Sequence, residues 1–239
     1  MDFYYLLIVI VLFGSIQSVV GLGLLLFGTP MLLILGYAYI EVLWILLPAS
    51  CSLSLFQIFE NYKLVQAKKE VYFFTIPALL FSLILIIKLD YLFDIKRIVG
   101  VFLLSIAILR LTNLSDKWAE ALITKGKNLM YLLIGFVHGL SNLGGAPLAV
   151  LASSIYKDNK KISSNIAFVY FVLAISQLIV LSTYKSELFV SSYLVFIPVV
   201  ILNHLVLRKI LFRHIDNSKF KIFINLVIFF FADVLFSGR

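Results

Sequence analysis

Residues His138 to Leu151 read HGLSNLGGAPLAVL, and they place a histidine, a serine, an asparagine, paired glycines and a proline inside an apolar run. The whole chain has 239 residues, of which 62% are hydrophobic and only 13% charged. Soluble domains carry about 25% charged residues. The stretch therefore predicts a helix break within hydrocarbon, and the fold has to be one that shelters such a break.

Long apolar runs recur along the chain. Four of them are Val42–Phe59, Val71–Ile87, Ile162–Thr183 and Leu188–Leu207, and about 20 apolar residues cross a bilayer as a helix. We therefore expect an all-α polytopic protein of the cell membrane, with the lipid bilayer around it. The first helix has no basic region before it and no cleavage pattern after it, so we expect it to be retained.

Cysteine and charge narrow the function classes. The single cysteine, Cys51, excludes a disulfide within the chain and a thiol metal site, so we expect no metal and no cofactor. The net charge of +8 indicates either an anionic partner or basic loops that hold the cytoplasmic side, and we favour the loops. We expect no nucleic-acid partner, and the chain has no phosphate-binding loop motif for ATP.

The chain resembles itself. Gly14 and Gly135, Gln17 and His138, and Pro77 and Pro198 are each separated by the same interval, and GTP at 28–30 matches GAP at 145–147. The repeat predicts two membrane halves, residues 1–114 and 128–239, joined by a cytoplasmic linker, residues 115–127. Each half reads as a Gly/Pro-broken helical hairpin followed by three transmembrane helices. Such repeats are typical of secondary transporters.

Basic residues decide between two orientations of the halves. If the halves are parallel, the 20 Lys and Arg divide nine to eleven between the two sides. If the first pieces of each half fold as a hairpin, the halves are inverted and the division becomes fifteen to five. Only the second division shows the asymmetry of the positive-inside rule. We therefore expect inverted repeats with both termini outside.

The two breaks are Ser18–Pro30 and His138–Pro147. Breaks survive in hydrocarbon only where protein buries them or where they line a cavity. We expect Pro30 and Pro147 to begin short helices, such as Met31–Ile40, whose first amides then face a gap with partial positive charge and suit a small anion. The alternative is a glycine-rich face for close helix packing.

The candidate anion ligands are the polar and glycine residues at or beside these breaks. A serine among them could instead bond to its own helix, and a buried histidine could simply pack. We expect His204 and Asp233 to lie at the membrane interface, which leaves His138 as the intramembrane group able to bind an anion or carry a proton. The candidates are Gln17, Ser18, Gly23, Gly28, Thr29, Ser50, Ser52 and Gln57 in the first half, and His138, Ser141, Asn142, Gly144, Gly145, Asn165 and Gln177 in the second.

These segments resemble the sulfite exporter TauE/SafE family of permeases. The two copies are GSIQSVVGLGLLLFGTPMLL and GFVHGLSNLGGAPLAVL, and the likeness extends over VYFFTIPALLFSLILI and SYLVFIPVVILNHLVLRKIL. The chain departs from the family where Leu24–Phe27 interrupts the first glycine tip and where the second keeps only Gly144 and Gly145. The resemblance implies transport of small sulfur-containing or carboxylated anions, often outward.

We therefore predict a secondary transporter that exports a small organosulfonate, sulfite-like or related anion. An anion channel is one alternative, and an enzyme that uses His138 with Ser141 or Asn142 is another. The enzyme is disfavoured because no second histidine or carboxylate lies at a compatible spacing. Proton coupling and a homodimeric assembly are both compatible with the sequence, which does not name the anion.

Overall fold

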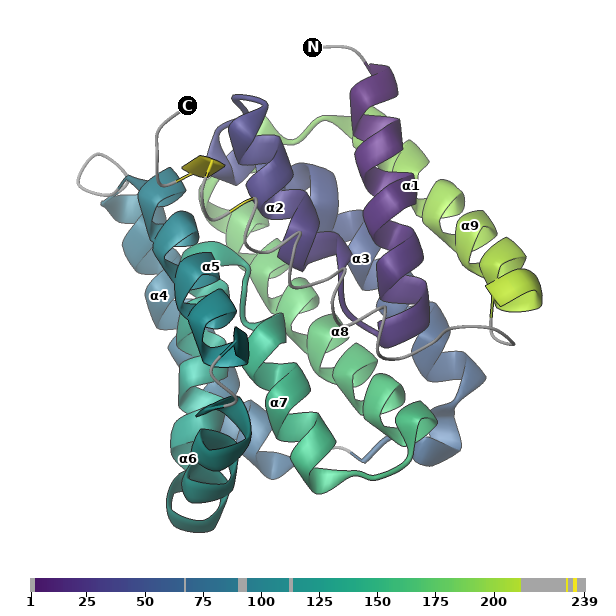
Figure 1. Ribbon diagram of the computed structural model, residues 1–239. Helices are drawn as coiled ribbons and strands as arrows, with labels where there is room; N and C mark the ends of the chain where they lie inside the picture. The colour runs from purple at the N-terminus through teal and green to yellow at the C-terminus, as the bar shows by residue number, and fades with distance from the viewer. Residues whose placement is uncertain are drawn as a thin grey trace.

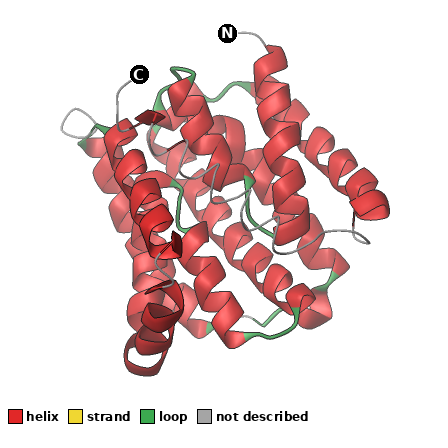
Figure 2. Cartoon of the chain, viewed as in Figure 1, coloured by secondary structure: helices red, strands yellow, loops and turns green. Residues whose placement is uncertain are grey.

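The computed structural model describes residues 3–66, 68–89, 94–111, 114–211, 231 and 234–235, and those parts are helices joined by short turns (Figure 2). Asp233 and most of the last predicted helix lie outside this part of the chain. The helices are α1 Phe3–Val20, α2 Leu24–Ile34, α3 Tyr39–Glu60, α4 Ile76–Lys88, α5 Ile95–Leu111, α6 Leu114–Ser141, α7 Gly145–Ile155, α8 Asn159–Tyr184 and α9 Phe196–Leu211. Short turns of other helix types lie at Tyr62–Leu64, Val71–Thr75, Ser186–Leu188 and Ser191–Val195.

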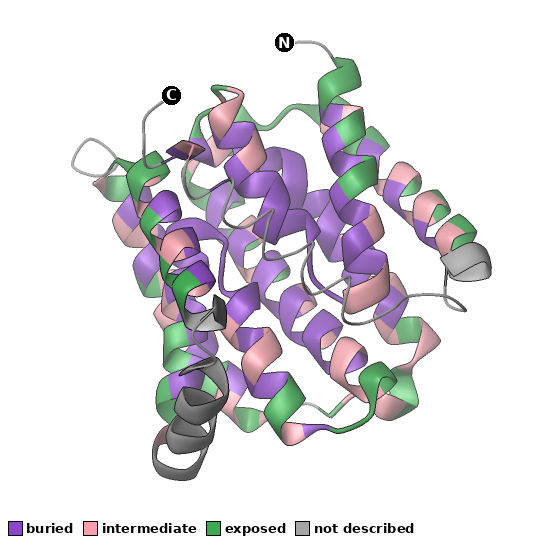
Figure 3. Ribbon diagram, viewed as in Figure 1, coloured by how far each residue is buried: buried purple, intermediate pink, exposed green. Residues whose placement is uncertain are grey.

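Within the described part of the chain, four helical segments are long and apolar enough to cross a membrane, namely Phe3–Val20, Tyr39–Glu60, Val71–Lys88 and Asn159–Tyr184. The chain is thus a polytopic helical protein, as predicted. Helix α3 is the most buried of these spans and packs against α8 at the centre of the bundle. Buried residues gather at that centre and exposed ones on the outer helices (Figure 3). Large apolar side chains such as Tyr4, Phe73 and Ile179 point outward, as lipid-facing residues do.

Two helical hairpins enter the bundle from opposite ends (Figure 1). From the N-terminus α1 runs into the bundle, and α2 returns toward the end from which α1 came. From the other end α6 runs in, and α7 returns toward it. Helices α2 and α7 have 11 residues each, about 16 Å at 1.5 Å per residue, or half a bilayer core.

The first hairpin turns at Gly21–Gly23. The φ angles of Gly21 and Gly23 are 85° and 158°, in the region that favours glycine. The prediction that Pro30 begins the short helix is wrong, because α2 already begins at Leu24 and Pro30 lies inside it. The buried apolar residues Leu24–Phe27 continue the helix up to the glycine turn. The amides of Gly28 and Thr29 therefore belong to a helix interior and do not face a gap.

The second hairpin turns at Asn142–Gly144, and Asn142 adopts a φ of 65°. Here Pro147 does lie in the first turn of its helix, α7. This arrangement agrees with the sequence-based expectation, since proline suits a position whose N–H has no partner inside the helix.

The loops sort to two ends of the bundle. At one end the Gln66 amide donates to Asn165 Oδ1 at 2.8 Å, and Lys127 Nζ lies 2.7 Å from Glu70 Oε1. At the other end Trp44 Nε1 donates to the carbonyl of Lys185 at 3.0 Å. The Lys88 ammonium lies there too, 6.0 Å from the centre of the Tyr184 ring.

The predicted linker, residues 115–127, is helical. It forms the start of α6, which kinks at Gly126, where φ is −158° and ψ is 42°. Lys127 follows the kink and donates a hydrogen bond to Glu70, which holds the pKa of that carboxyl below its usual range. The ion pair therefore ties the kink to the segment that precedes α4. The division into two halves and the cytoplasmic side of the linker stay predictions.

Candidate functional site

The second hairpin tip closes around two aromatic side chains. His138 lies one turn before the end of α6 and Tyr170 lies on α8, both with no exposed surface. Their rings meet edge to face with centroids 5.7 Å apart. A Cβ added at Gly144 would lie 2.6 Å from His138 Cβ, and one added at Gly145 would collide with the Tyr170 hydroxyl. The glycines thus let the tip backbone touch both side chains.

A chain of amides joins this tip to the first half. Gln177 Nε2 on α8 donates to Asn142 Oδ1 at 3.3 Å. Asn142 Nδ2 in turn donates to Thr29 Oγ1 on α2 at 3.1 Å. All three side chains are fully buried. The tip of one hairpin therefore contacts the short helix of the other near the centre of the protein. We call His138, Asn142, Tyr170 and Gln177 the tip cluster.

Four polar atoms of the tip cluster have no hydrogen-bond partner. They are both ring nitrogens of His138, the hydroxyl of Tyr170 and Oε1 of Gln177. Gln177 faces His138 without meeting the geometry of a hydrogen bond. More than nine in ten buried polar groups in proteins are hydrogen-bonded. Several unpartnered atoms at one buried tip therefore make the tip cluster the candidate site for a ligand.

The chemistry of the tip cluster suits a small anion. The imidazole N–H and the phenol O–H are donors without an acceptor, and Gly145 opens α7 with one of the amides that find no acceptor inside a helix. Helix N-termini favour negative charge. Among the described residues no group of three His, Cys, Asp or Glu side chains could hold a metal ion.

The corresponding polar side chains of the first half are hydrogen-bonded within the protein, except for Oε1 of Gln57, which has no partner. Gln17 Nε2 donates to Ser54 Oγ at 3.1 Å, and Ser50 Oγ donates to Gln17 Oε1 at 3.2 Å. Gln57 Nε2 donates to the carbonyl of Gln17 at 3.0 Å. These hydrogen bonds hold α1 against α3. The amide of Gln17 is therefore fully hydrogen-bonded within the protein and has no free atom for a ligand.

Three of the four predicted serines bond back to their own helices, as the alternative interpretation expects, and the fourth, Ser50, donates to Gln17. Ser18, Ser52 and Ser141 donate to the carbonyls four residues earlier at 2.8, 2.8 and 2.7 Å. Gly28 packs against Leu46, whose side chain lies 3.1 Å from an added Cβ. Gly23 forms part of the turn of the first hairpin. None of these residues points a free polar atom at the tip cluster.

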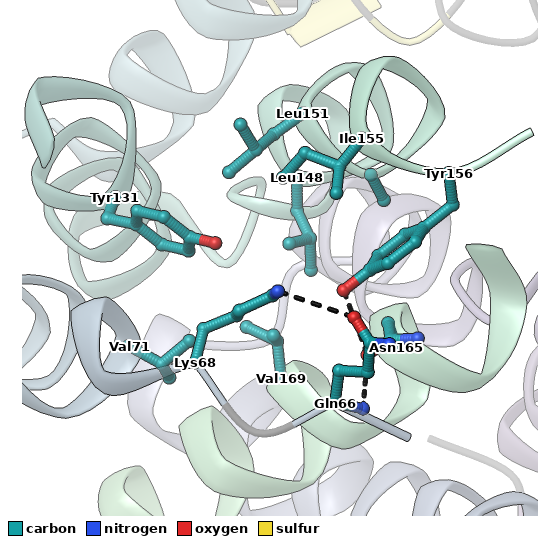
Figure 4. Close-up of a pocket in the computed structure, with 11 residues that line it drawn as sticks. Gln66, Lys68, Val71, Tyr131, Leu148, Leu151, Ile155, Tyr156, Asn165 and Val169 are labelled. Carbon is teal, nitrogen blue, oxygen red and sulfur yellow. Dashed lines mark hydrogen bonds between the residues drawn. The ribbon is translucent and has the colours of Figure 1, made fainter. Parts of the chain in front are cut away.

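Asn165 lies apart from the tip, at the end of the bundle that holds Gln66 and Tyr156 (Figure 4). Its Oδ1 accepts from the Gln66 amide at 2.8 Å and from the Tyr156 hydroxyl at 3.3 Å. Its Nδ2 donates to the carbonyls of Leu64 and Lys161 at 3.0 and 2.7 Å. Asn165 therefore fastens two loops together with its whole hydrogen-bonding capacity.

Tyr170 is the member of the tip cluster that the sequence analysis missed. It stands seven residues before Gln177 on α8, which places both side chains on one helix face two turns apart. Its position seven residues before Gln177, a predicted polar ligand on the same helix, is the sequence signal that would have identified Tyr170. A tyrosine in a long apolar run does not attract attention by itself.

Comparison with known proteins adds the family. The family model described as sulfite exporter TauE/SafE matches residues 6–233. No curated protein and no solved structure matches the chain. The match spans both hairpins and both copies of the Gly- and Pro-containing segment, so the chain belongs to the sulfite exporter TauE/SafE family, whose members are membrane transporters and not enzymes.

Proposed function

We propose that the protein is a secondary transporter that exports a small sulfonate- or sulfite-like oxyanion, and that the tip cluster is its central site. The observation that carries this proposal is the group of four unpartnered polar atoms in a cluster with no exposed surface. Unmade hydrogen bonds in such a place cost stability. A bound oxyanion would satisfy the two donors, His138 and Tyr170, without needing a cationic side chain.

Inverted halves are part of the proposal, and the positions of the loops support them. Contacts join segment 61–70 with Tyr156 and Asn165 and with Lys127 at one end. Lys88, Tyr184 and Lys185 meet at the other end. A parallel arrangement of the halves would separate 61–70 from 157–161, and these contacts speak against it. The basic end is then cytoplasmic and both termini are outside.

A carrier is favoured over a channel. The side chains of the tip cluster have no exposed surface, whereas the side chains that line an open pore would be exposed to water. A ligand held there must wait for one hairpin to move away from the other. Inverted repeats that rock around a fixed midplane site provide such a movement.

The test is a thermal-shift screen of purified protein with sulfite, thiosulfate, taurine, sulfoacetate and lactate. A ligand that binds only the folded state stabilises it by about 2.7 kcal/mol at 100 times its Kd. Asn142→Ala breaks the chain from Gln177 to Thr29 and should weaken binding by about five- to 150-fold, the equivalent of about 1–3 kcal/mol.

Gly145→Val should abolish binding, because its side chain occupies the place where the tip meets Tyr170. Gly126→Val is the matched control, since an added Cβ at the kink meets nothing closer than Leu129 Cβ at 3.6 Å. If Gly145→Val folds well and binds the anion as tightly as the wild type, the tip is a packing face and the proposal fails.

A further inference from the structure

A polar cavity lies at the basic end of the bundle, apart from the tip cluster. Its volume is about 220 Å³, several times the roughly 30 Å³ that one water occupies in the liquid. Helices α1, α3, α8 and α9 contribute its walls. Polar side chains that line it include Ser18, Gln57, Asn61, Ser163, Ser164 and His204. The cavity is therefore large enough to hold several water molecules together with a small oxyanion.

His204 forms the α9 side of this cavity. Its side chain is 3% exposed, and its Nε2 lies 3.1 Å from Glu60 Oε2. The expectation that His204 lies at the interface is wrong, because α9 turns it inward onto α3, where the Phe56 ring packs edge to face against it. On this side the cavity is therefore bounded by packed side chains of α3 and α9.

Gln57 forms the inner end of the cavity. Of the α3 residues that line it, Gln57 lies farthest from the basic end, where α3 ends at Glu60. Its Nε2 donates to the carbonyls of Gln17 and Ser18 at 3.0 and 3.4 Å. Its Oε1 is buried without a partner, whereas buried polar atoms are normally hydrogen-bonded to protein or water. Two hydrogen bonds therefore hold a side chain with one unpaired oxygen between the cavity and the interior.

Helix α8 leads from the cavity to the tip cluster. Ser163 lines the cavity, and Tyr170 and Gln177 belong to the tip cluster. The three residues are spaced seven apart, which places them on one face of α8 at intervals of two turns, or about 10 Å. The residues four positions after Ser163 and Tyr170, on the same face, are Ala167 and Ala174, both fully buried. One helix face with polar and small side chains therefore connects the cavity with the tip.

We propose that the transported anion reaches the tip cluster from the basic end through this cavity and along the α8 face from Ser163 to Gln177, and that Gln57 closes the route at the inner end of the cavity. The inference rests on the proposed anion transport and adds its path. An anion that enters an apolar interior loses its water at a high cost, and a path of hydroxyl and amide side chains lowers that cost. With Gln57 bonded to α1 the route is shut, which agrees with the lack of exposed surface at the tip cluster.

The first test measures which positions of α8 a thiol reagent reaches. Ser163→Cys, Ala167→Cys and Ile166→Cys are each made in a Cys51→Ala protein, which has no native thiol. A maleimide that carries a sulfonate group is added to membrane vesicles on one side at a time. We expect Ser163→Cys to react from the basic end and Ala167→Cys to react much more slowly from that end. Ile166 is buried like Ala167 but lies on another face of α8, so Ile166→Cys should stay unmodified.

Gln57→Ala tests the closure of the route. It removes two hydrogen bonds, so Ala167→Cys should react about five- to 150-fold faster from the basic end, the equivalent of about 1–3 kcal/mol. Ile166→Cys should stay unmodified in the same background. The Gln17 carbonyl also accepts from the Gly21 amide at 2.8 Å, so the variant does not leave that carbonyl unpaired.

The transport test uses the modified proteins in proteoliposomes after the excess maleimide is removed. Counterflow is measured with whichever of sulfite, thiosulfate, taurine, sulfoacetate and lactate gives the largest thermal shift. Modified Ser163→Cys should lose counterflow, because the attached group fills the cavity. Ser154→Cys is the matched control, because Ser154 is an exposed serine near the end of α7 at the same end of the bundle but outside the cavity. Its modification should leave counterflow unchanged.

Ala167→Cys that reacts no faster with Gln57→Ala than with Gln57 overturns the inference and leaves the proposed transport intact, since the labelling involves no anion binding. So does a modified Ser163→Cys protein that keeps full counterflow. If Gln57→Ala does not fold, the transport test decides alone. Wild-type protein that binds none of the five anions contradicts the proposed function itself, and the inference falls with it.

Discussion

Replacing Tyr170 by phenylalanine removes one oxygen atom and leaves the ring in place. In the structure that oxygen is fully buried, has no hydrogen-bond partner and faces Gly145. A buried polar group without a partner costs about 1–3 kcal/mol. Tyr170→Phe removes this cost and keeps the edge-to-face contact with His138. The ligand-free protein should therefore become more stable, by up to about that amount.

The same change should weaken anion binding. If the Tyr170 hydroxyl donates to the bound anion, losing it costs about 1–3 kcal/mol of affinity, or about five- to 150-fold. A gain in stability together with a loss of affinity distinguishes a ligand-binding group from one kept for packing. Thermal denaturation without ligand and an anion titration of the same samples measure the two effects.

Tyr156→Phe is the matched control. The Tyr156 hydroxyl donates to Asn165 Oδ1 at 3.3 Å, so its removal loses a hydrogen bond that the protein has made. The variant should be less stable by about 0.5–1.5 kcal/mol and bind the anion as the wild type does. A Tyr170→Phe protein that is destabilised and has unchanged affinity would refute the assignment of the hydroxyl to the ligand.

Three further predictions concern topology, electrostatics and packing. An impermeant thiol reagent added to intact cells should label a cysteine placed at Glu187 and leave one placed at Gln66 unlabelled, and the reverse pattern would exclude the proposed orientation. Lys127→Gln should lower the stability of the folded protein at neutral pH but not in acid. The pKa of Glu70 is lowered by its pair with Lys127, so the pair stabilises the fold above the usual pKa of a carboxyl and stops doing so as the pH falls through the lowered value. A difference in denaturation midpoint between variant and wild type that persists in acid would contradict this role of the pair. Gly139→Ala should destabilise the protein by about 1–3 kcal/mol, because an added Cβ collides with Ser82 on α4, and should leave the anion affinity per folded molecule unchanged. Thermal denaturation tests this, with Gly126→Ala as the control. A Gly139→Ala protein as stable as the wild type would be inconsistent with the packing of α6 against α4.

The sequence predicted the parts of the fold that apolar runs determine. Helix α3, Tyr39–Glu60, contains the predicted run Val42–Phe59, and Pro147 lies in the first turn of α7 as expected. The start of α2 was misplaced because a proline and a glycine near Thr29 looked like a turn, while the turn lies at Gly21–Gly23. Composition marks where a break is allowed, but packing against Ser163 and Ile16 decides where it occurs.

The site was harder to predict because its contacts span the chain. His204 and Glu60 are 144 positions apart, and no local pattern links them, so His204 read as an interfacial residue. Asn142 and Thr29, 113 positions apart, were both predicted as ligands, yet their hydrogen bond could not be foreseen. Residue type indicated which side chains are polar in an apolar chain. Only the structure tells which of them have already found partners.

That distinction makes the two hairpins unequal despite their common pattern. Gln17 and His138 occupy matching places in the repeat, yet Gln17 has both ends of its amide bonded to α3 while both nitrogens of His138 are without a partner. A fully bonded hairpin is costly to move, and one with unmade bonds loses little when it moves. If transport needs one hairpin to leave the other, the second is the cheaper one to displace, and the bond from Asn142 to Thr29 is the direct side-chain hydrogen bond between tip and α2 that must break.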